Sequence, residues 1–354
     1  MRAVIFRYPT EFPADDIERR VPDAATAREL VRERNPQLLE LLAHRRERFA
    51  PLIAARTDHP PVAGAEDAVL MAFCRLAFRH GSWGDDFHAY HNEGHIFEIL
   101  GPRLERLIAA IGITSLSLRD WFLLALFAAA HDLRQREVPQ FAAGTGSNER
   151  ASIEETFRIL HACGFSRERN AEVFTSIELM IAGSTFDARP AMPAAEFNSA
   201  ELVVESGGAL AQKLDTKLDK HAPGWRADTN VVHALELALV AADLDTANVA
   251  EDFPLLMASA ERLCLEREMR SHRDPASAAS AQPMLDFLTT GQEHYFFDLH
   301  RFSSAQGRAA FAAAKLANVQ PMRALVRDLR AALPAPRTGN EVLAAFHALA
   351  NKAR

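Results

Sequence analysis

The sequence has only three cysteines, no long apolar run and no block of like charge. Cys74, Cys163 and Cys264 lie far apart and form no CxxC pair, so neither a thiolate zinc site nor a disulfide framework is indicated. The longest apolar run, residues 121–130, is much shorter than the roughly 20 residues that a membrane-spanning helix needs. Residues 1–20 lack the apolar stretch of a secretory signal. We therefore expect a cytoplasmic protein that does not enter a membrane.

Acidic and basic residues are mixed along the 354-residue chain, which has a net charge of −7. The densest basic run, residues 45–48, is interrupted by Glu47. Nucleic-acid-binding surfaces usually carry a continuous basic patch, so we expect no nucleic-acid partner. A local group of arginines could still bind a small phosphate ester, and Arg134, Arg136 and Arg150 are candidates for this role.

Strict alternation of apolar and polar residues is nearly absent, whereas apolar residues recur at helical spacing. This pattern predicts an all-α fold. Helices are expected over residues 38–44, 104–111, 121–130, 153–160, 235–244 and 322–333. The segments 121–130 and 235–244 are apolar on nearly every side, which is typical of buried helices.

Breaks in the pattern divide the chain into three parts. We expect an N-terminal helical extension over residues 1–80, packed on a catalytic domain over residues 81–330, and a C-terminal helical tail over residues 331–354. Glycines in residues 81–84 mark a loop at the first boundary, and Pro334 ends a helix near the second.

Potential metal ligands occur in three short motifs, Tyr-His-Asn-Glu-Gly-His at 90–95, Ala-His-Asp at 130–132 and Ala-Asp-Leu at 242–244. His91 and His95 are four residues apart and would share one face of a helix. His131, Asp132 and Asp243 each follow an apolar helical segment, where burial is costly unless they are paired or bind a metal. Mixed imidazole and carboxylate ligands suit Zn, Fe, Mn, Ni or Co, with Mg possible at an oxygen-rich position.

His95, His131-Asp132 and Asp243 resemble the H…HD…D signature of the HD-domain superfamily of metal-dependent phosphohydrolases. The Tyr-His-Asn-x-x-His and Ala-Asp-Leu motifs are similar to those of the cyclic nucleotide phosphodiesterases, over roughly residues 80–300. The resemblance implies a phosphodiesterase-like helical bundle with two divalent metal ions. It assigns the four residues to the first ion, with Asp132 bridging to the second.

The implied activity is hydrolysis of a cyclic nucleotide or similar small phosphate ester to a 5′-monophosphate by a metal-bridging hydroxide. The resemblance makes His91 the general acid, a role that suits an imidazole with a pKa of about 6.5. His91 could alternatively be a third ligand or a structural residue. Glu155 could orient His91 or a metal-bound water, or belong to a helix-capping box that begins at Ser152.

The predicted substrate site contains Tyr90, Asn92, Gln292 and Phe296. Asn92 either contacts phosphate or caps a helix. Gln292 is the best candidate for the purine-binding glutamine of the phosphodiesterases, although it could equally be a surface residue. Phe296 could stack on a base, or pack in the core. The sequence departs from the phosphodiesterases directly after His131-Asp132 and after Ala-Asp-Leu, which affects base selectivity more than the metal site.

Three other functions fit the same residues. The chain could be a nucleotide or metabolite phosphomonoesterase of the HD superfamily, an HD-fold diiron oxygenase with additional histidine ligands, or a non-catalytic nucleotide sensor. The expected partner is a small phosphate ester or nucleotide, and a homodimer is possible. His80 and His88 have no support from these motifs, and His88, the nearest to the predicted site, is expected to be peripheral.

Overall fold

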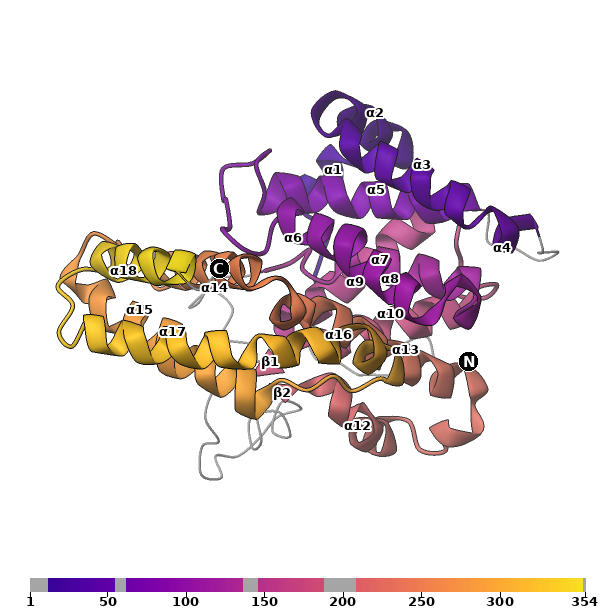
Figure 1. Ribbon diagram of the computed structural model, residues 1–354. Coiled ribbons are helices and arrows are strands. Elements are labelled where there is room, and N and C mark those ends of the chain that lie inside the picture. Colours follow the sequence, from indigo (N-terminus) through magenta and orange to yellow (C-terminus); the bar gives the residue numbers. More distant parts are fainter. Residues whose placement is uncertain (1–11, 55–61, 136–145, 188–207, 353–354) are drawn as a thin grey trace.

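The computed structural model describes residues 12–54, 62–135, 146–187 and 208–352, which form an all-α fold (Figure 1). In this part of the chain the only strands are β1 (Phe186–Asp187) and β2 (Gly208–Ala209), which form one short antiparallel pair. The α-helices of the first half are α1 (Asp16–Arg20), α2 (Ala24–Arg34), α3 (Pro36–Arg48), α4 (Ala50–Ala54), α5 (Val62–Arg79), α6 (Glu93–Glu98), α7 (Leu104–Ile111), α8 (Leu118–Ala130), α9 (Ser147–Ala162) and α10 (Ala171–Ser184).

The α-helices of the second half are α12 (Leu214–His221), α13 (Thr229–Asp245), α14 (Phe253–Arg270), α15 (Ala281–Asp286), α16 (Ala305–Ala317), α17 (Val319–Ala332) and α18 (Gly339–Lys352). Shorter or wider helical turns are η1 (Ile99–Arg103), η2 (Ile113–Ser115), η3 (Leu210–Lys213), η4 (Trp225–Ala227), η5 (Thr246–Ala250), η6 (Ala278–Ser280), η7 (Phe287–Gly291) and η8 (His294–Leu299). The helices predicted from apolar spacing are confirmed as α3, α7, α8, α9, α13 and α17.

Apolar helices α5, α8, α10 and α13 form the centre of the molecule. Helix α10 packs along α13, and α8 contacts α5, α10 and α13. Helix α8 begins with a capping box between Ser117 and Asp120 and is buried on nearly every side. Because its apolar residues continue to its last turn, the His131 and Asp132 side chains that follow are also buried. The packing of α8 therefore places two potential metal ligands inside the protein.

The N-terminal helices share this core. Helices α1 and α2 pack on α5, which in turn packs on α8 and α9 (Figure 1). Glu18 of α1 forms an ion pair of 3.1 Å with Arg75 of α5, and both side chains are buried. Residues 1–11 and 55–61 of the predicted extension lie outside the described residues.

The C-terminal helices form a second group. Helix α18 packs against α14, α15 and α17, and Figure 1 shows these orange and yellow helices extending to the left of the central helices. Helix α16 contacts α7, α13 and η5, which joins this group to the centre. Helix α17 ends at Ala332, two residues before Pro334. No helix within the described ranges is long and apolar enough to cross a membrane.

Candidate metal centre

Four side chains from α6, the end of α8 and the end of α13 meet in the protein interior: His95, His131, Asp132 and Asp245. His131 Nε2 lies 3.0 Å from Asp132 Oδ2 and 3.3 Å from Asp245 Oδ1. His95 Nε2 lies 3.1 Å from the same oxygen of Asp245 and 3.9 Å from Asp132 Oδ2. We call these four residues the histidine–aspartate cluster. The structure thus brings together three of the predicted ligands and adds a fourth that the sequence motifs do not identify.

Several lone pairs of the cluster point toward one another. The Nδ1–H of His131 donates to the carbonyl oxygen of Phe127 at 3.1 Å, which directs the lone pair of Nε2 toward the two aspartates. His131 Nε2 and Asp132 Oδ2 are buried atoms with no hydrogen-bond partner among the described residues. His95 Nδ1 also lacks one, but it faces Glu98 Oε2 at 3.7 Å and not the cluster. Buried acceptors that face one another are unfavourable unless a cation lies between them. The donor set therefore fits a divalent metal ion, with the Phe127 carbonyl orienting a ligand histidine.

The imidazoles and carboxylates of the histidine–aspartate cluster stabilise each other's charged forms. Burial alone would lower the pKa of His131, but Asp132 and Asp245 raise it well above its usual value. Burial alone would raise the pKa values of Asp132 and Asp245, but His131 keeps both below the usual range. Without a metal, a proton on the imidazole balances the carboxylates; a divalent ion would take over that role.

The carboxylate that α13 brings to the cluster is Asp245, not the predicted Asp243. Asp243 accepts hydrogen bonds from the backbone N–H groups of Ser303 and Ser304, both at 2.8 Å, and from the Ser304 hydroxyl at 2.6 Å. Burial raises the pKa of Asp243 to about 6. Residues two apart on a helix point about 200° apart, so only one of the two aspartates can face His95 and His131. The structure therefore places Asp245, and not the predicted Asp243, beside His95 and His131.

His91 lies beside the cluster and is held by Glu266 of α14. Its Nδ1 is 2.5 Å from Glu266 Oε1, while Glu266 Oε2 accepts hydrogen bonds from the backbone N–H groups of Tyr90 and His91 at 2.8 and 2.9 Å. Burial alone would lower the pKa of His91, but Glu266 and Asp132 raise it to about 9. The imidazole is therefore protonated at neutral pH. Its side chain remains 20% exposed, so a ligand can reach it.

Glu155, predicted to orient His91, is instead part of a buried network of arginines and carboxylates. It forms ion pairs with Arg75 at 3.5 Å, with Arg79 at 3.2 Å and with Arg134. Three guanidinium groups surround this carboxylate, so it has no contact left for His91. The structure assigns the orienting contact to Glu266, which the sequence reasoning missed.

Other predicted roles around Glu155 also change. Ser152 lies inside α9 rather than at its start, so the predicted capping box does not form, and its hydroxyl accepts a hydrogen bond from the Arg134 backbone N–H at 3.1 Å. The Arg134 side chain pairs with Glu18 and Glu155, which leaves it inside the protein instead of facing a phosphate. Arg150 is buried and pairs with Glu154 at 3.2 Å. Arg136 lies outside the described residues.

Two of the predicted substrate-binding residues lie at the cluster. The Tyr90 ring is buried, with its centroid 4.7 Å from that of His95. Asn92 is the N-cap of α6: its Oδ1 accepts from the Gly94 N–H at 2.8 Å, and its Nδ2 donates to the His88 carbonyl at 2.6 Å. Of the two interpretations of Asn92, the structure shows the helix cap.

The other two predicted substrate-binding residues belong to the C-terminal part. Phe296 is 1% exposed and packs in the core, with Lys315 Nζ 5.0 Å from its ring centroid. Gln292 is buried between η7 and η8 rather than on the surface. Within the described ranges, no hydrogen bond joins Gln292 to the histidine–aspartate cluster.

The sequence motifs did not identify a polar edge beside Asp132, which is formed by the side chains of Gln135, Asn148 and Glu149. Gln135 donates from Nε2 to Asp132 Oδ1 at 2.6 Å, and Asn148 donates to Gln135 Oε1 at 3.1 Å. Burial, together with the nearby Asp132 charge, raises the pKa of Glu149 to about 6. These contacts fix Asp132 Oδ1 and leave Oδ2 to face the histidines. The Asn148-Glu149 pair, which follows the His-Asp motif, was the only signal in the sequence for this edge.

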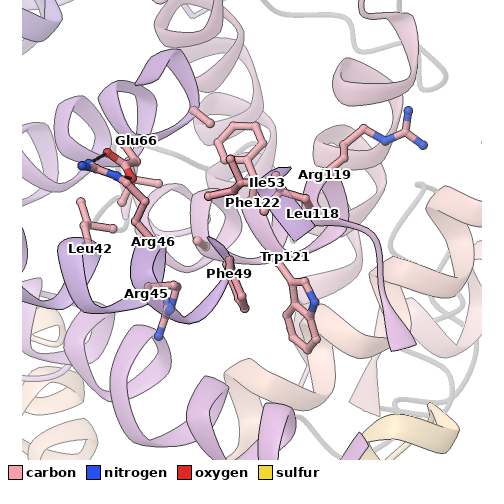
Figure 2. A pocket seen from close by; sticks show the side chains of 13 residues that line it. Leu42, Arg45, Arg46, Phe49, Ile53, Glu66, Leu118, Arg119, Trp121 and Phe122 are labelled. Carbon is pink, nitrogen blue, oxygen red and sulfur yellow. Dashed lines mark hydrogen bonds and ion pairs between the residues drawn. The ribbon is translucent and has the colours of Figure 1, made fainter. Parts of the chain in front are cut away.

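A separate pocket lies between α3, α4, α5 and α8 (Figure 2). Phe49, Trp121 and Phe122 are among its apolar lining residues, while Arg45, Arg46, Glu66 and Arg119 are its polar ones. None of the predicted site residues lines it. A candidate function must therefore be argued from the histidine–aspartate cluster rather than from this pocket.

A comparison with models of known protein families finds no match, and a comparison with curated proteins finds none either.

Proposed function

We propose that the chain is a metal-dependent phosphohydrolase of the HD-domain type, acting as a phosphodiesterase on a cyclic nucleotide or a similar small phosphate ester. The observation that carries the proposal is the pairing of two features. Ring nitrogens of His95 and His131 converge with carboxylate oxygens of Asp132 and Asp245, and His131 Nε2 and Asp132 Oδ2 have no hydrogen-bond partner among the described residues. The imidazole of His91, whose pKa is raised, lies beside them. A cation site next to a proton donor is the arrangement that hydrolysis of a phosphate ester requires.

The four residues of the histidine–aspartate cluster would hold the metal. Two imidazoles and two carboxylates suit ions such as Zn, Fe, Mn, Ni or Co. A bound divalent ion would supply an acidified water and positive charge for a phosphoryl group. The second ion that the motifs predict would share Asp132 and take most of its remaining ligands from water.

His91 would act as the general acid. Glu266 binds Nδ1 of its ring, which leaves the opposite nitrogen, Nε2, free to give its proton to a leaving oxygen. In the reaction a water oxygen bonds to phosphorus, the bond from phosphorus to the leaving oxygen breaks, and the leaving oxygen takes the proton from His91. The proton lost by water restores the charged imidazole over the cycle. Glu266 positions His91 and keeps it protonated.

The experiment compares His91→Ala with His44→Ala, an exposed histidine on α3. Cyclic AMP, cyclic GMP and linear phosphate monoesters are supplied with added Mn or Mg, and metal content is measured on the same samples. We expect His91→Ala to lower turnover by about 10²- to 10⁴-fold with unchanged metal content, because only the proton donor is lost. His44→Ala should match the wild type.

The products decide between the candidate reactions. A 5′-monophosphate formed from a cyclic nucleotide would support the phosphodiesterase, whereas turnover of monoesters alone would favour the phosphomonoesterase. Loss of metal in His91→Ala would contradict the general-acid role and make His91 a ligand. Two firmly bound irons with a visible absorption band and no hydrolysis would favour the oxygenase. Nucleotide binding without turnover in a metal-loaded sample would favour the sensor.

A further inference from the structure

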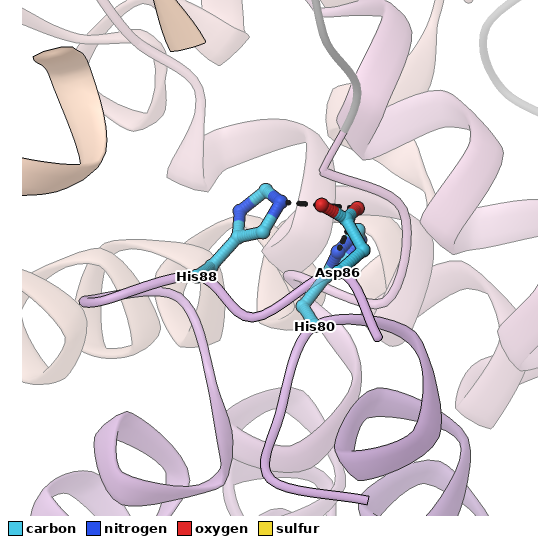
Figure 3. Close-up of side chains that lie close together, drawn as sticks. All are labelled: His80, Asp86 and His88. Atoms are coloured by element: carbon cyan, nitrogen blue, oxygen red, sulfur yellow. Dashed lines mark ion pairs between the residues drawn. The ribbon is translucent and has the colours of Figure 1, made fainter. Parts of the chain in front are cut away.

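A second group of potential ligands lies where the chain leaves α5: His80, Asp86 and His88 (Figure 3). Asp86 Oδ2 lies 3.5 Å from His80 Nδ1 and 3.4 Å from His88 Nε2. One ligand atom from each of the three residues lies within 4.8 Å of the others. We call these residues the loop cluster. The sequence motifs gave no role to its two histidines, and the structure places both of them together in the interior.

The backbone of the loop holds the two imidazoles side by side. The backbone N–H of His88 donates to the carbonyl of His80 at 2.9 Å, which joins the two ends of the loop. Gly84 passes so close to the carbonyl of Phe78 that a side chain there would overlap it. As a result, the two ring centroids lie only 4.1 Å apart. The arrangement is built into the loop and does not depend on flexible surface side chains.

The ring nitrogens of the loop cluster lack ordinary partners. His80 is 3% exposed and His88 is fully buried, and none of their four ring nitrogens has a hydrogen-bond partner among the described residues. An imidazole always carries at least one N–H, and buried polar groups of this kind are normally hydrogen-bonded. Two buried histidines with this defect, both facing one carboxylate oxygen, require an explanation.

The distances from the two histidines to Asp86 explain why these nitrogens lack hydrogen bonds. Separations of 3.4 and 3.5 Å are long for an N–H···O hydrogen bond. They are close to the spacing of two ligands of one tetrahedral zinc ion, since atoms about 2.0–2.1 Å from the metal lie about 3.3–3.4 Å from each other. The Asp86 side chain is 58% exposed, so solvent can reach the carboxylate that faces both histidines.

We infer that His80, Asp86 and His88 form a second divalent-metal site, of the zinc class, with water as the fourth ligand. This site is distinct from the histidine–aspartate cluster, and the inference does not depend on the proposed phosphohydrolase activity.

Glu266 connects the two sites. Its Oε1 lies 3.4 Å from His88 Nδ1 and 2.5 Å from His91 Nδ1. Histidines that bind a metal through one nitrogen commonly donate the other N–H to a carboxylate. An ion bound at His88 Nε2 leaves Nδ1–H facing Glu266 and thereby fixes the carboxylate that holds His91.

The test is a titration of the full-length protein with Zn²⁺ alone, after a chelator has removed bound metal. Isothermal titration calorimetry measures the number of zinc equivalents bound and their affinity. Asp86→Asn removes the charged ligand, and Asp85→Asn is the matched control, since both aspartates are exposed and adjacent in the loop. A third protein, His131→Ala, disrupts the histidine–aspartate cluster. Circular dichroism and metal-free unfolding show that each variant retains its fold.

We expect Asp85→Asn to bind as many zinc equivalents as the wild type. Asp86→Asn should lose one equivalent, or bind it at least about tenfold more weakly, because direct ligands contribute more than the outer partners whose loss costs about 10- to 100-fold. The His131→Ala protein should retain the loop equivalent. Equal zinc binding by Asp86→Asn and Asp85→Asn, or no zinc bound by folded His131→Ala, would overturn the inference. If the histidine–aspartate cluster binds no zinc, the difference in zinc binding between Asp86→Asn and Asp85→Asn should still be seen.

Discussion

Two buried groups of charged residues begin in the same turn after α8, yet they differ in how their charges are paired. In the arginine–carboxylate network, Glu155 is surrounded by the guanidinium groups of Arg75, Arg79 and Arg134. In the histidine–aspartate cluster, His131 Nε2 and Asp132 Oδ2 face each other with no hydrogen-bond partner among the described residues. In the network three guanidinium groups neutralise the carboxylate permanently, whereas the carboxylates of the cluster depend on the protonation of an imidazole.

This difference indicates which group is structural and which is a site. Both groups are buried and charged, so burial and charge alone do not separate them. A buried ion pair with complete partners is explained by the fold that it joins, here α1, α5 and α9. Buried polar atoms that converge without a hydrogen-bond partner indicate a place where a ligand or ion can bind. The loop cluster, whose four ring nitrogens have no hydrogen-bond partner among the described residues, resembles the second case.

The largest effect is expected when the two aspartates of α13, Asp245 and Asp243, are replaced separately by asparagine. Asp245→Asn should lower metal affinity by more than about 100-fold, since a direct ligand is lost, and activity should fall with it. Asp243→Asn should keep the metal and weaken only the contact with Ser303 and Ser304. Metal content after dialysis, measured for both variants, checks this expectation. Metal loss in Asp243→Asn but not in Asp245→Asn would reverse the assignment.

Breaking the arginine–carboxylate network should affect stability without affecting metal binding. Glu155→Ala leaves Arg75, Arg79 and Arg134 with less buried countercharge, and we expect it to cost about 3–5 kcal/mol of unfolding free energy. Urea unfolding measures the change, with Glu40→Ala, an exposed residue of α3, as the control. A fall in metal content of folded Glu155→Ala would show that the network serves the metal site as well.

A smaller loss of stability is expected where α16 meets Asp243. A Cβ at position 307 would overlap the Asp243 carboxylate, so Gly307→Ala should lower the free energy of unfolding by about 1–3 kcal/mol. Gly101→Ala is the matched control, because a Cβ there meets nothing within 4 Å. Thermal unfolding of the two variants measures the difference. Equal stability of the two variants would contradict the close packing of α16 on Asp243.

The smallest effect at neutral pH is expected from Glu266→Gln. Burial acts to lower the pKa of His91, and Glu266 and Asp132 raise it to about 9. As a general acid His91 must be protonated, so wild-type kcat/KM should fall as pH rises through the pKa of His91, which Glu266 holds above its usual value. Glu266→Gln should move this limb toward 6.5 and cost about fourfold in activity at pH 7, where about a quarter of such imidazoles stay protonated. An unmoved limb in the pH–rate profile would exclude His91 as the titrating acid.

Much of the fold and part of the site follow from local patterns. Apolar spacing predicted the central helices, and the burial of α8 by itself carries His131 and Asp132 into the interior. The spacing of His91 and His95 predicted that they would lie near each other, and their ring centroids are 6.2 Å apart. The predicted shared helix face does not form, because α6 begins at Glu93 and His91 lies in the turn before it; the two rings are close because the turn is short.

The remaining parts of the site depend on which helix faces which. Asp243 and Asp245 both end an apolar helix, and only the packing of α13 against α6 and α8 decides which one meets the histidines. Glu266 lies on α14, far along the chain from His91, and no local pattern separates it from Glu261 or Glu268. The loop cluster likewise appears only when the loop closes on His80.

The most direct test of the account is the metal content of the wild type and of His131→Ala after loading with Zn or Mn and removal of free ions. Elemental analysis should find at least one more ion per chain in the wild type than in the variant, because His131 provides the nitrogen that faces both aspartates. Equal metal content in the two folded proteins would contradict the central claim that the histidine–aspartate cluster is a metal site.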